Sequence, residues 1–260
     1  MELACDTLYK EKKIRGFCHL YTGQEGIAEG MEAALTFEDP LISAYRVHCQ
    51  AYKRGYSVRQ IVSEMLGRAN GATKGKGGSM HYYKKSTNFY GGNGIVGAQI
   101  PVGTGLAFAL KYQKKPNVAC IMFGDGASNQ GQLYEAANMA KIWNLPALFI
   151  CENNIYGMGT SIDRSSMNPL FYTRGDHIPG VRADGNNMLQ VREVMKWAKS
   201  YSVENGPLYL EFMTYRYHGH SMSDPGTTYR TRDEVQNHRK TTDPILKLGL
   251  MGTEHKLVTE

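Results

Sequence analysis

Hydrophobic residues in this chain gather into short runs, separated by polar and glycine-rich segments. Two of these runs, residues 118–123 and 147–151, are bounded by turn residues and have the length and composition of buried parallel strands. The intervening residues 129–143 have a helical spacing of apolar positions. Those positions are Leu133, Ala136, Ala137, Ala140 and Trp143. The pattern therefore predicts a strand, a helix and a second parallel strand, joined by a right-handed crossover.

The same patterns predict further elements on both sides of this unit. We expect helices over residues 23–35, 49–67, 97–112 and 187–202, and strands over residues 41–45, 178–182 and 207–215. Residues 70–94, 155–177 and 216–231 are expected to be loops or irregular segments. The alternation of helices and strands is typical of an α/β fold, with a mostly parallel sheet flanked by helices. We expect a single domain over residues 1–260.

Polar residues follow both central strands. Gly124-Asp125-Gly126 comes after the first strand and Asn153-Asn154 after the second. Because ligands of open α/β sheets bind at the carboxyl ends of the strands, we expect these segments to meet there. Carboxylate and amide oxygens suit Mg²⁺, which also takes phosphate oxygens and water. Glycines allow close backbone approach, and a helix that begins near Asn129 favours phosphate. The pair therefore predicts a metal-bridged diphosphate, although either segment alone is a common turn.

Composition narrows the possible classes of protein. The hydrophobic fraction of 42% is typical of a globular protein, and no stretch approaches the length of a membrane span. The net charge of +6 is spread along the chain, without the basic stripe of a nucleic-acid binder. The five cysteines show neither zinc spacing nor a Cys-x-x-Cys pair, which fits a reducing compartment.

Two glycine-rich segments imitate nucleotide-binding motifs. Gly92-x-Gly94-x-x-Gly97 has the spacing of a dinucleotide fingerprint, but no hydrophobic strand precedes it and no acidic residue lies between Gly97 and Asp125. Residues 75–79 lack the spacing of a phosphate-binding loop and the helix that should follow it. Neither segment therefore predicts a nicotinamide enzyme or a nucleotide hydrolase.

The Gly-Asp-Gly and Asn-Asn pair resembles the thiamine diphosphate motif, and four longer segments resemble one family. That family is the alpha subunit of the decarboxylating first component of the pyruvate dehydrogenase complex. The likeness covers about residues 1–245 and implies a thiamine diphosphate-binding fold that holds thiamine diphosphate and Mg²⁺. It also implies the absence of the family's C-terminal region from this sequence. The segments are residues 14–20, 75–81, 88–98 and 215–226.

The resemblance implies a role for each matching residue. Asp125, Asn154 and the main-chain oxygen of Tyr156 would bind the metal, and His220, His19 and His48 would be catalytic, His220 at the cofactor phosphates. Arg46 has the planar fork that suits diphosphate, although as an isolated residue it would read as a surface side chain. The implied cofactor-binding residues are Tyr45, Arg46, Gly94, Val96, Gly124, Asp125, Gly126, Ala127, Asn154, Tyr156 and His220.

The resemblance also implies partners and regulation. The family works as a heterotetramer of two alpha and two beta subunits in the mitochondrial matrix, and passes an acetyl group to a lipoyl-bearing acetyltransferase for acetyl-CoA synthesis. A regulatory kinase and phosphatase act on it, at positions that match Ser221, Thr228 and Ser161. The first twenty residues are mixed in charge, so we expect no transit peptide in this sequence.

Two alternatives remain open at this point. One is the alpha subunit of a branched-chain 2-oxo acid dehydrogenase, which would share the fold and cofactor. The other is a non-catalytic paralogue that occupies the beta subunit and regulates assembly. It is suggested by the short C-terminus and by Glu29, a charge within a helix that the family makes small and apolar.

Overall fold

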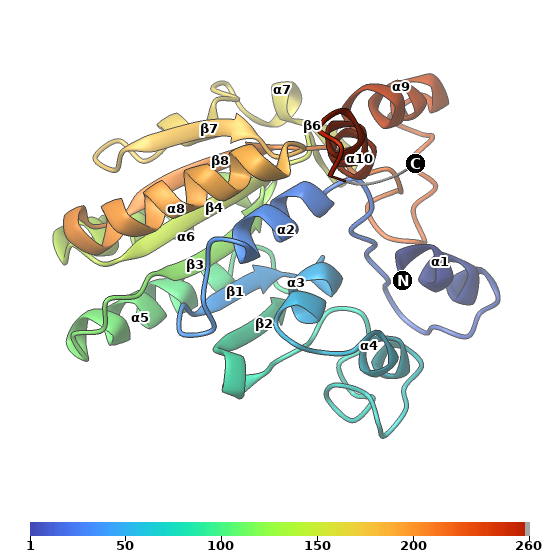
Figure 1. Cartoon of the computed structure of the whole chain (residues 1–260), viewed down its shortest axis with the longest axis horizontal. Coiled ribbons are helices and arrows are strands. Elements are labelled where there is room, and N and C mark those ends of the chain that lie inside the picture. Colours follow the sequence, from blue (N-terminus) through green and yellow to red (C-terminus); the bar gives the residue numbers. More distant parts are fainter. Residues whose placement is uncertain (258–260) are drawn as a thin grey trace.

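The computed structural model describes residues 1–257. A six-stranded sheet with the order β2-β1-β3-β4-β8-β7 forms its centre, and every pairing in this sheet is parallel (Figure 1). The predicted α/β fold is confirmed. The strands are β1 (Leu41–Ala44), β2 (Phe89–Asn93), β3 (Ala119–Gly124), β4 (Ala147–Asn153), β7 (Gly180–Asp184) and β8 (Leu208–Met213). A separate antiparallel pair is formed by β5 (Tyr156–Gly157) and β6 (Thr160–Ser161).

Helices cover both faces of the sheet. The helices are α1 (Glu2–Lys10), α2 (Glu25–Glu32), α3 (His48–Lys53), α4 (Val58–Met65), α5 (Gln99–Tyr112), α6 (Gly131–Ile142), α7 (Ile162–Ser165), α8 (Met188–Asn205), α9 (Arg232–Thr242) and α10 (Pro244–Glu254). Figure 1 shows α2 and α8 side by side across one face, and α5 and α6 lie on the other. Among the described residues, no helix is long and apolar enough to cross a membrane.

Two hydrophobic cores result, one on each face of the sheet. Alternate residues of β3 point to opposite cores, so that Met122 packs with α2 and α8 while Ile121 packs with α5 and α6. Because both faces of the central strands are buried, these strands are continuously apolar. The helical positions predicted to face the sheet are buried in α6, except Trp143, which is about half exposed.

The register of β3 and β4 places the two polar segments together. Gly124 pairs with Glu152, so Asp125 leaves the end of β3 where Asn154 leaves the end of β4. The predicted strand–helix–strand unit is therefore confirmed. A short 3₁₀ turn, Ala127–Asn129, separates Asp125 from α6, which begins two residues later than the sequence suggested.

Several predicted boundaries need correction. Residues 49–67 form two helices rather than one, because Ser57 begins α4 with a capping box to Gln60. Residues 70–94, predicted to be a loop, contain the edge strand β2. Its sequence Phe-Tyr-Gly-Gly-Asn has too little β propensity to reveal a strand. The glycines are needed there, since a Cβ on Gly92 would lie 2.1 Å from the carbonyl oxygen of Met80.

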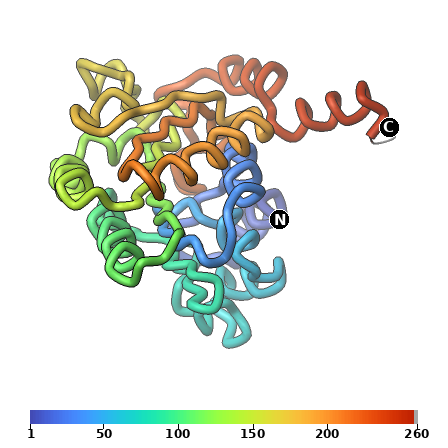
Figure 2. Tube along the Cα trace, turned by 60° about the vertical axis from the view of Figure 1, so that its left-hand side comes forward, coloured from blue at the N-terminus to red at the C-terminus, as the bar shows by residue number. Residues whose placement is uncertain are grey.

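The C-terminal part of the chain consists of a polar loop followed by two helices. Residues 216–231 form the predicted polar loop, and α9 and α10, which the sequence analysis did not identify, follow it. Figure 2 shows α10 extending away from the body of the molecule. All five cysteines are free thiols.

Candidate cofactor site

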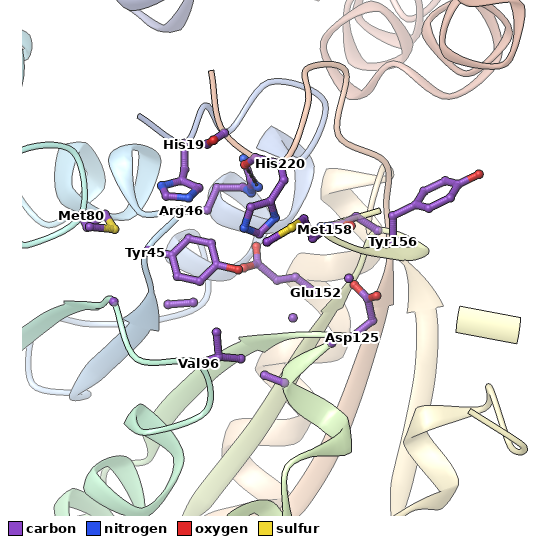
Figure 3. Close-up of a pocket in the computed structure, with 18 of the residues that line it drawn as sticks. His19, Tyr45, Arg46, Met80, Val96, Asp125, Glu152, Tyr156, Met158 and His220 are labelled. Atoms are coloured by element: carbon purple, nitrogen blue, oxygen red, sulfur yellow. Dashed lines mark hydrogen bonds between the residues drawn. The ribbon is translucent and has the colours of Figure 1, made fainter. Parts of the chain in front are cut away.

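A cavity of about 650 Å³ opens at the carboxyl ends of β1, β3 and β4 (Figure 3). It is lined by residues from segments far apart in the sequence, as expected for an α/β fold. All of the predicted cofactor-binding residues lie on its wall. The predicted residues found there are His19, Tyr45, Arg46, Gly94, Val96, Gly124, Asp125, Gly126, Ala127, Asn154, Tyr156, His220 and Ser221.

Asp125 is an almost fully buried carboxyl without a fixed cation. Burial raises its pKa to about 6, while its own backbone N–H, that of Asn154, and the more distant Arg216 and Arg46 act in the opposite direction. No salt bridge to Asp125 occurs among residues 1–257. A divalent cation at this carboxylate would remove the cost of burying its charge.

The two adjacent asparagines have different functions. Asn153 is structural: its Nδ2 donates to Glu211 at 2.7 Å, and its Oδ1 accepts from the N–H of Ile155 at 3.0 Å. The Nδ2 of Asn154 donates to Gln24 at 3.0 Å, but its buried Oδ1 has no hydrogen-bond partner among the described residues. Asn154 therefore presents an unused oxygen beside Asp125, as a metal ligand requires.

Tyr156 lies at the edge of the cavity, and its ring points away from the other labelled side chains (Figure 3). Its hydroxyl donates to Glu234 at 3.1 Å, so the side chain anchors α9 instead of the site. This orientation is compatible with the predicted role of its main-chain oxygen. Among residues 1–257, no group of three or more His, Cys, Asp or Glu side chains could hold a metal. A metal here would need ligand oxygens from a cofactor or water as well, which suits Mg²⁺ bound to a diphosphate.

Arg46 and two histidines form the opposite wall. The guanidinium of Arg46 donates to the carbonyl oxygens of Leu20 at 2.5 Å and of His220 at 2.7 Å, which fixes it on the wall of the cavity. The rings of His19 and His220 are packed edge to face, with 5.3 Å between their centroids, and both rings contact that of Tyr45 (Figure 3). These residues come from three distant segments, which the fold brings together.

Both imidazoles are neutral at physiological pH. Burial lowers the pKa of His19 to about 2 and that of His220 to about 4, and in both cases Arg46 lowers it further. The buried Nδ1 of His19 has no hydrogen-bond partner among the described residues. A neutral imidazole with a free ring nitrogen can accept or donate one hydrogen bond to a ligand.

His48 does not lie on the cavity wall, unlike His19 and His220. It is fully buried, with Nδ1 2.9 Å from a carboxylate oxygen of Glu2 and Nε2 2.8 Å from the hydroxyl of Ser79. Ser79 accepts in turn from the N–H of His19 at 3.2 Å. The structure thus does not support direct contact of His48 with substrate, and it places His48 behind the residues that form the wall.

The three predicted phosphorylation sites differ in position. Ser221 lies on the cavity wall and shares a 2.7 Å hydrogen bond with Ser223. Thr228 is exposed and lies in a separate groove lined by residues 227–232 and Glu234. Ser161 precedes α7 and is not part of the cavity wall.

Sequence reasoning missed three buried polar residues of the site, which are Glu152, Gln24 and Gln99. Glu152 lies on the cavity wall and accepts a short hydrogen bond from Tyr21. Burial raises its pKa to about 7, while Tyr21 and Arg46 act in the opposite direction. Gln24 contacts Asn154, and Gln99 donates to the carbonyl of Met122. Glu152 was detectable, because an acidic residue that continues an otherwise apolar strand is buried and requires an explanation.

Comparison with known proteins places the chain in a family. The family model of the dehydrogenase E1 component matches residues 1–260. The chain is 55% identical over 260 residues to the Arabidopsis thaliana protein named pyruvate dehydrogenase E1 component subunit alpha-1, mitochondrial, covering all of this chain and 67% of the relative. It is 61% identical over 246 residues to the corresponding alpha subunit of Schizosaccharomyces pombe, covering 94% of this chain and 60% of the relative.

A probable alpha subunit of Caenorhabditis elegans is 60% identical over 246 residues, covering 94% of this chain and 62% of that protein. The chain thus spans about two thirds or slightly less of the length of these relatives. The match over its whole length, together with the thiamine diphosphate motif at the ends of β3 and β4, shows that this chain belongs to the dehydrogenase E1 component family, whose members depend on thiamine diphosphate.

Proposed function

We propose that this chain is the alpha subunit of a mitochondrial pyruvate dehydrogenase (acetyl-transferring). The observation that carries the proposal is the buried pair of Asp125 and Asn154, which offers an uncompensated carboxylate and an unused amide oxygen at one edge of the sheet. The relatives described above are named as mitochondrial alpha subunits of this enzyme. The product would supply acetyl-CoA synthesis through a lipoyl-bearing acetyltransferase.

Different residues of the site would bind different parts of the cofactor. Asp125, Asn154 and the main-chain oxygen of Tyr156 would hold Mg²⁺, and Arg46 and His220 would bind the diphosphate. Gly94, Val96, Gly124, Gly126 and Ala127 line the cavity without bulky polar groups, so they leave room for the rings. Thiamine diphosphate supplies the electron sink that accepts the electron pair when a 2-oxo acid loses carbon dioxide.

The neutral imidazole of His19 suits the handling of an uncharged keto group. His19 keeps a free Nδ1 beside Tyr45 and His220, where it would hydrogen-bond substrate. The pKa of His19, about 2, keeps the ring neutral over the physiological range. Its role would therefore be orientation through a hydrogen bond rather than the donation of a positive charge.

A beta subunit is part of this proposal. In the family that the chain resembles, the carboxylate that activates the cofactor's aminopyrimidine comes from the beta subunit. Among the described residues, the acids on the cavity wall are Asp125, Glu152 and Asp224. Asp224 already accepts from the N–H groups of His220 and Gly226 and from the hydroxyl of Tyr229, so it is not free for this role.

Phosphorylation would act on this site through Ser221. A phosphate there adds nearly two negative charges to the wall of a cavity that binds an anionic cofactor. It would also break the contact with Ser223 and disturb residues 216–231. Thr228 and Ser161, which lie outside the cavity, would affect the cofactor only indirectly.

Co-expression with a beta subunit of this family tests the proposal. The purified complex should decarboxylate pyruvate only when thiamine diphosphate and Mg²⁺ are added. Turnover should be much lower with 2-oxoisovalerate, and the opposite preference would establish the branched-chain alternative. Absence of thiamine diphosphate binding in calorimetry would favour the non-catalytic paralogue. The structure removes one reason for that paralogue, because Glu29 is half exposed and pairs with Lys53 at 2.8 Å.

A further inference from the structure

The side chain of Asn154 has one occupied end and one free end. Its Nδ2 donates to Oε1 of Gln24 at 3.0 Å, and its Oδ1 is buried without a hydrogen-bond partner among residues 1–257. An asparagine amide can rotate by half a turn, which would exchange the oxygen for an NH₂ group that cannot bind a cation. The group that holds Nδ2 therefore decides whether Asn154 can serve as a metal ligand.

Gln24 is held by a rigid backbone. Its N–H donates to the carbonyl oxygen of Tyr21 at 3.0 Å, and the preceding Gly23 has φ +96°. The hydroxyl of Thr214 donates to the carbonyl of Gly23 at 3.2 Å, while the N–H of Thr214 donates to the carbonyl of Asn153 at 2.9 Å. The turn that carries Gln24 is thus fastened through the end of β8 to the strand end that carries Asn154.

Gly23 makes this turn possible. A Cβ at this position would lie 2.3 Å from the carbonyl oxygen of Tyr215, which is backbone and cannot move aside. The left-handed conformation also favours glycine. Gln24 is 1% exposed and lines the cavity from the start of α2.

We propose that Gln24 is a positioning residue for the metal: by accepting from Nδ2, it turns Oδ1 of Asn154 toward the cation. The inference rests on the metal site of the proposed function and assigns Gln24 a role there. Gln24 acts on the metal through Asn154, because its Oε1 accepts from Nδ2 of that residue. The other buried glutamine of the cavity, Gln99, donates to the carbonyl of Met122, and among the described residues it makes no hydrogen bond to a proposed metal ligand.

Binding of Mn²⁺ to the alpha–beta complex with saturating thiamine diphosphate, followed by electron paramagnetic resonance of free Mn²⁺, tests this role directly. Gln24→Met removes the acceptor while keeping the length of the side chain. Since loss of a residue that orients a ligand typically costs about 10–100-fold in metal affinity, we expect the dissociation constant to rise at least about tenfold. The matched control Gln190→Met removes an amide whose one side-chain hydrogen bond among residues 1–257 is from the N–H of Asp184, and it should leave Mn²⁺ binding unchanged.

Gln24→Glu separates orientation from mere packing. A carboxylate can only accept, so it forces Asn154 to donate from Nδ2 and to keep Oδ1 toward the metal. We expect Mn²⁺ affinity within about threefold of the unaltered complex or tighter. If Gln24→Glu instead lost affinity as strongly as Gln24→Met, accepting from Nδ2 would not be what Gln24 contributes, and the proposal would be overturned. If Gln24→Met does not assemble, a loss of Mn²⁺ affinity of about tenfold or more in Gln24→Glu relative to the unaltered complex overturns the proposal.

A parallel measurement on Asp125→Ala distinguishes failure of the role of Gln24 from failure of the proposed metal site. Loss of Mn²⁺ binding in Asp125→Ala with unchanged binding in Gln24→Met would refute the role of Gln24 and leave the metal site standing. Failure of the unaltered complex to bind Mn²⁺ with thiamine diphosphate would refute the proposed function itself.

Discussion

Replacing Asp125 by asparagine should stabilise the chain without metal while weakening the metal site, because the charge that attracts the cation is lost. The pKa of this carboxyl rises from 3.8 to about 6 on folding because of burial, so the ionised form is less stable in the folded chain than in the unfolded one. A rise of this size corresponds to about 3 kcal/mol at neutral pH. Asparagine has nearly the same shape and carries no charge, so it avoids this cost.

Part of that gain will be lost with a hydrogen bond. The carboxylate interacts with its own N–H and with that of Asn154. An asparagine at this position has one acceptor oxygen in place of two, so it can keep only one of these two hydrogen bonds. Loss of one such bond costs about 1 kcal/mol, which leaves a net stabilisation of about 2 kcal/mol. For a chain of this size, the midpoint of thermal unfolding should rise by roughly 4–8 °C.

Thermal unfolding in EDTA, followed by circular dichroism between pH 4 and pH 7.5, measures this effect. Between pH 3.8 and about 6 the folded chain binds more protons at Asp125 than the unfolded chain does. The contribution of Asp125 to the stability of the unaltered protein therefore falls as the pH rises through this window, and the advantage of Asp125→Asn grows with the pH. An advantage that is absent at pH 7.5, or equally large at pH 4, would refute this reasoning.

Asp224→Asn is a control with the opposite sign. Burial acts to raise the pKa of Asp224, but the Tyr229 hydroxyl and the N–H groups of His220 and Gly226 lower it below its usual value. The ionised carboxylate therefore stabilises the fold above the ordinary aspartate range, and this contribution is lost as the pH falls through the lowered pKa. Asp224→Asn should destabilise the chain at pH 7.5 in the same assay.

Three further changes test other parts of the structure. Ser221→Glu should weaken thiamine diphosphate binding in calorimetry at least about tenfold through charge repulsion, whereas Ser221→Ala should bind normally; equal binding by both would contradict the role of charge. Glu64 accepts hydrogen bonds from three backbone N–H groups within residues 73–77. Because Glu64→Ala removes this acceptor, limited proteolysis should cut the loop faster, and Glu64→Gln should be cut at an intermediate rate. Gly103→Ala should destabilise the chain by about 1–3 kcal/mol in urea unfolding, because its Cβ would lie 2.6 Å from the Ile121 side chain; the usual gain from replacing a helical glycine would show that this packing is loose.

The sequence by itself determined the central unit of the fold. The apolar runs of β3 and β4 are long enough to be recognised because both faces of each strand are buried, and the helical spacing between them fixes the crossover. The polar residues that follow these runs then had to share one sheet edge, so Asp125 and Asn154 were identifiable without coordinates. Local sequence patterns were enough to identify those site residues that directly follow a continuously apolar strand.

Only the tertiary structure decided which polar residues face the cavity. His19 and His48 have equal standing in the sequence, yet His19 lies on the wall and His48 lies behind it, held by Glu2 and Ser79. Strand β2 escaped prediction because its pairing with β1, rather than its own composition, makes it a strand.

The partnership of Gln24 and Asn154 joins residues 130 positions apart, and no local pattern encodes it. Hydrogen bonds between distant side chains depend on how the strand ends are packed, and a linear sequence carries no direct record of that packing. The residue types that bind the metal were therefore identifiable from the sequence, while the orientation of their side chains was set by the fold.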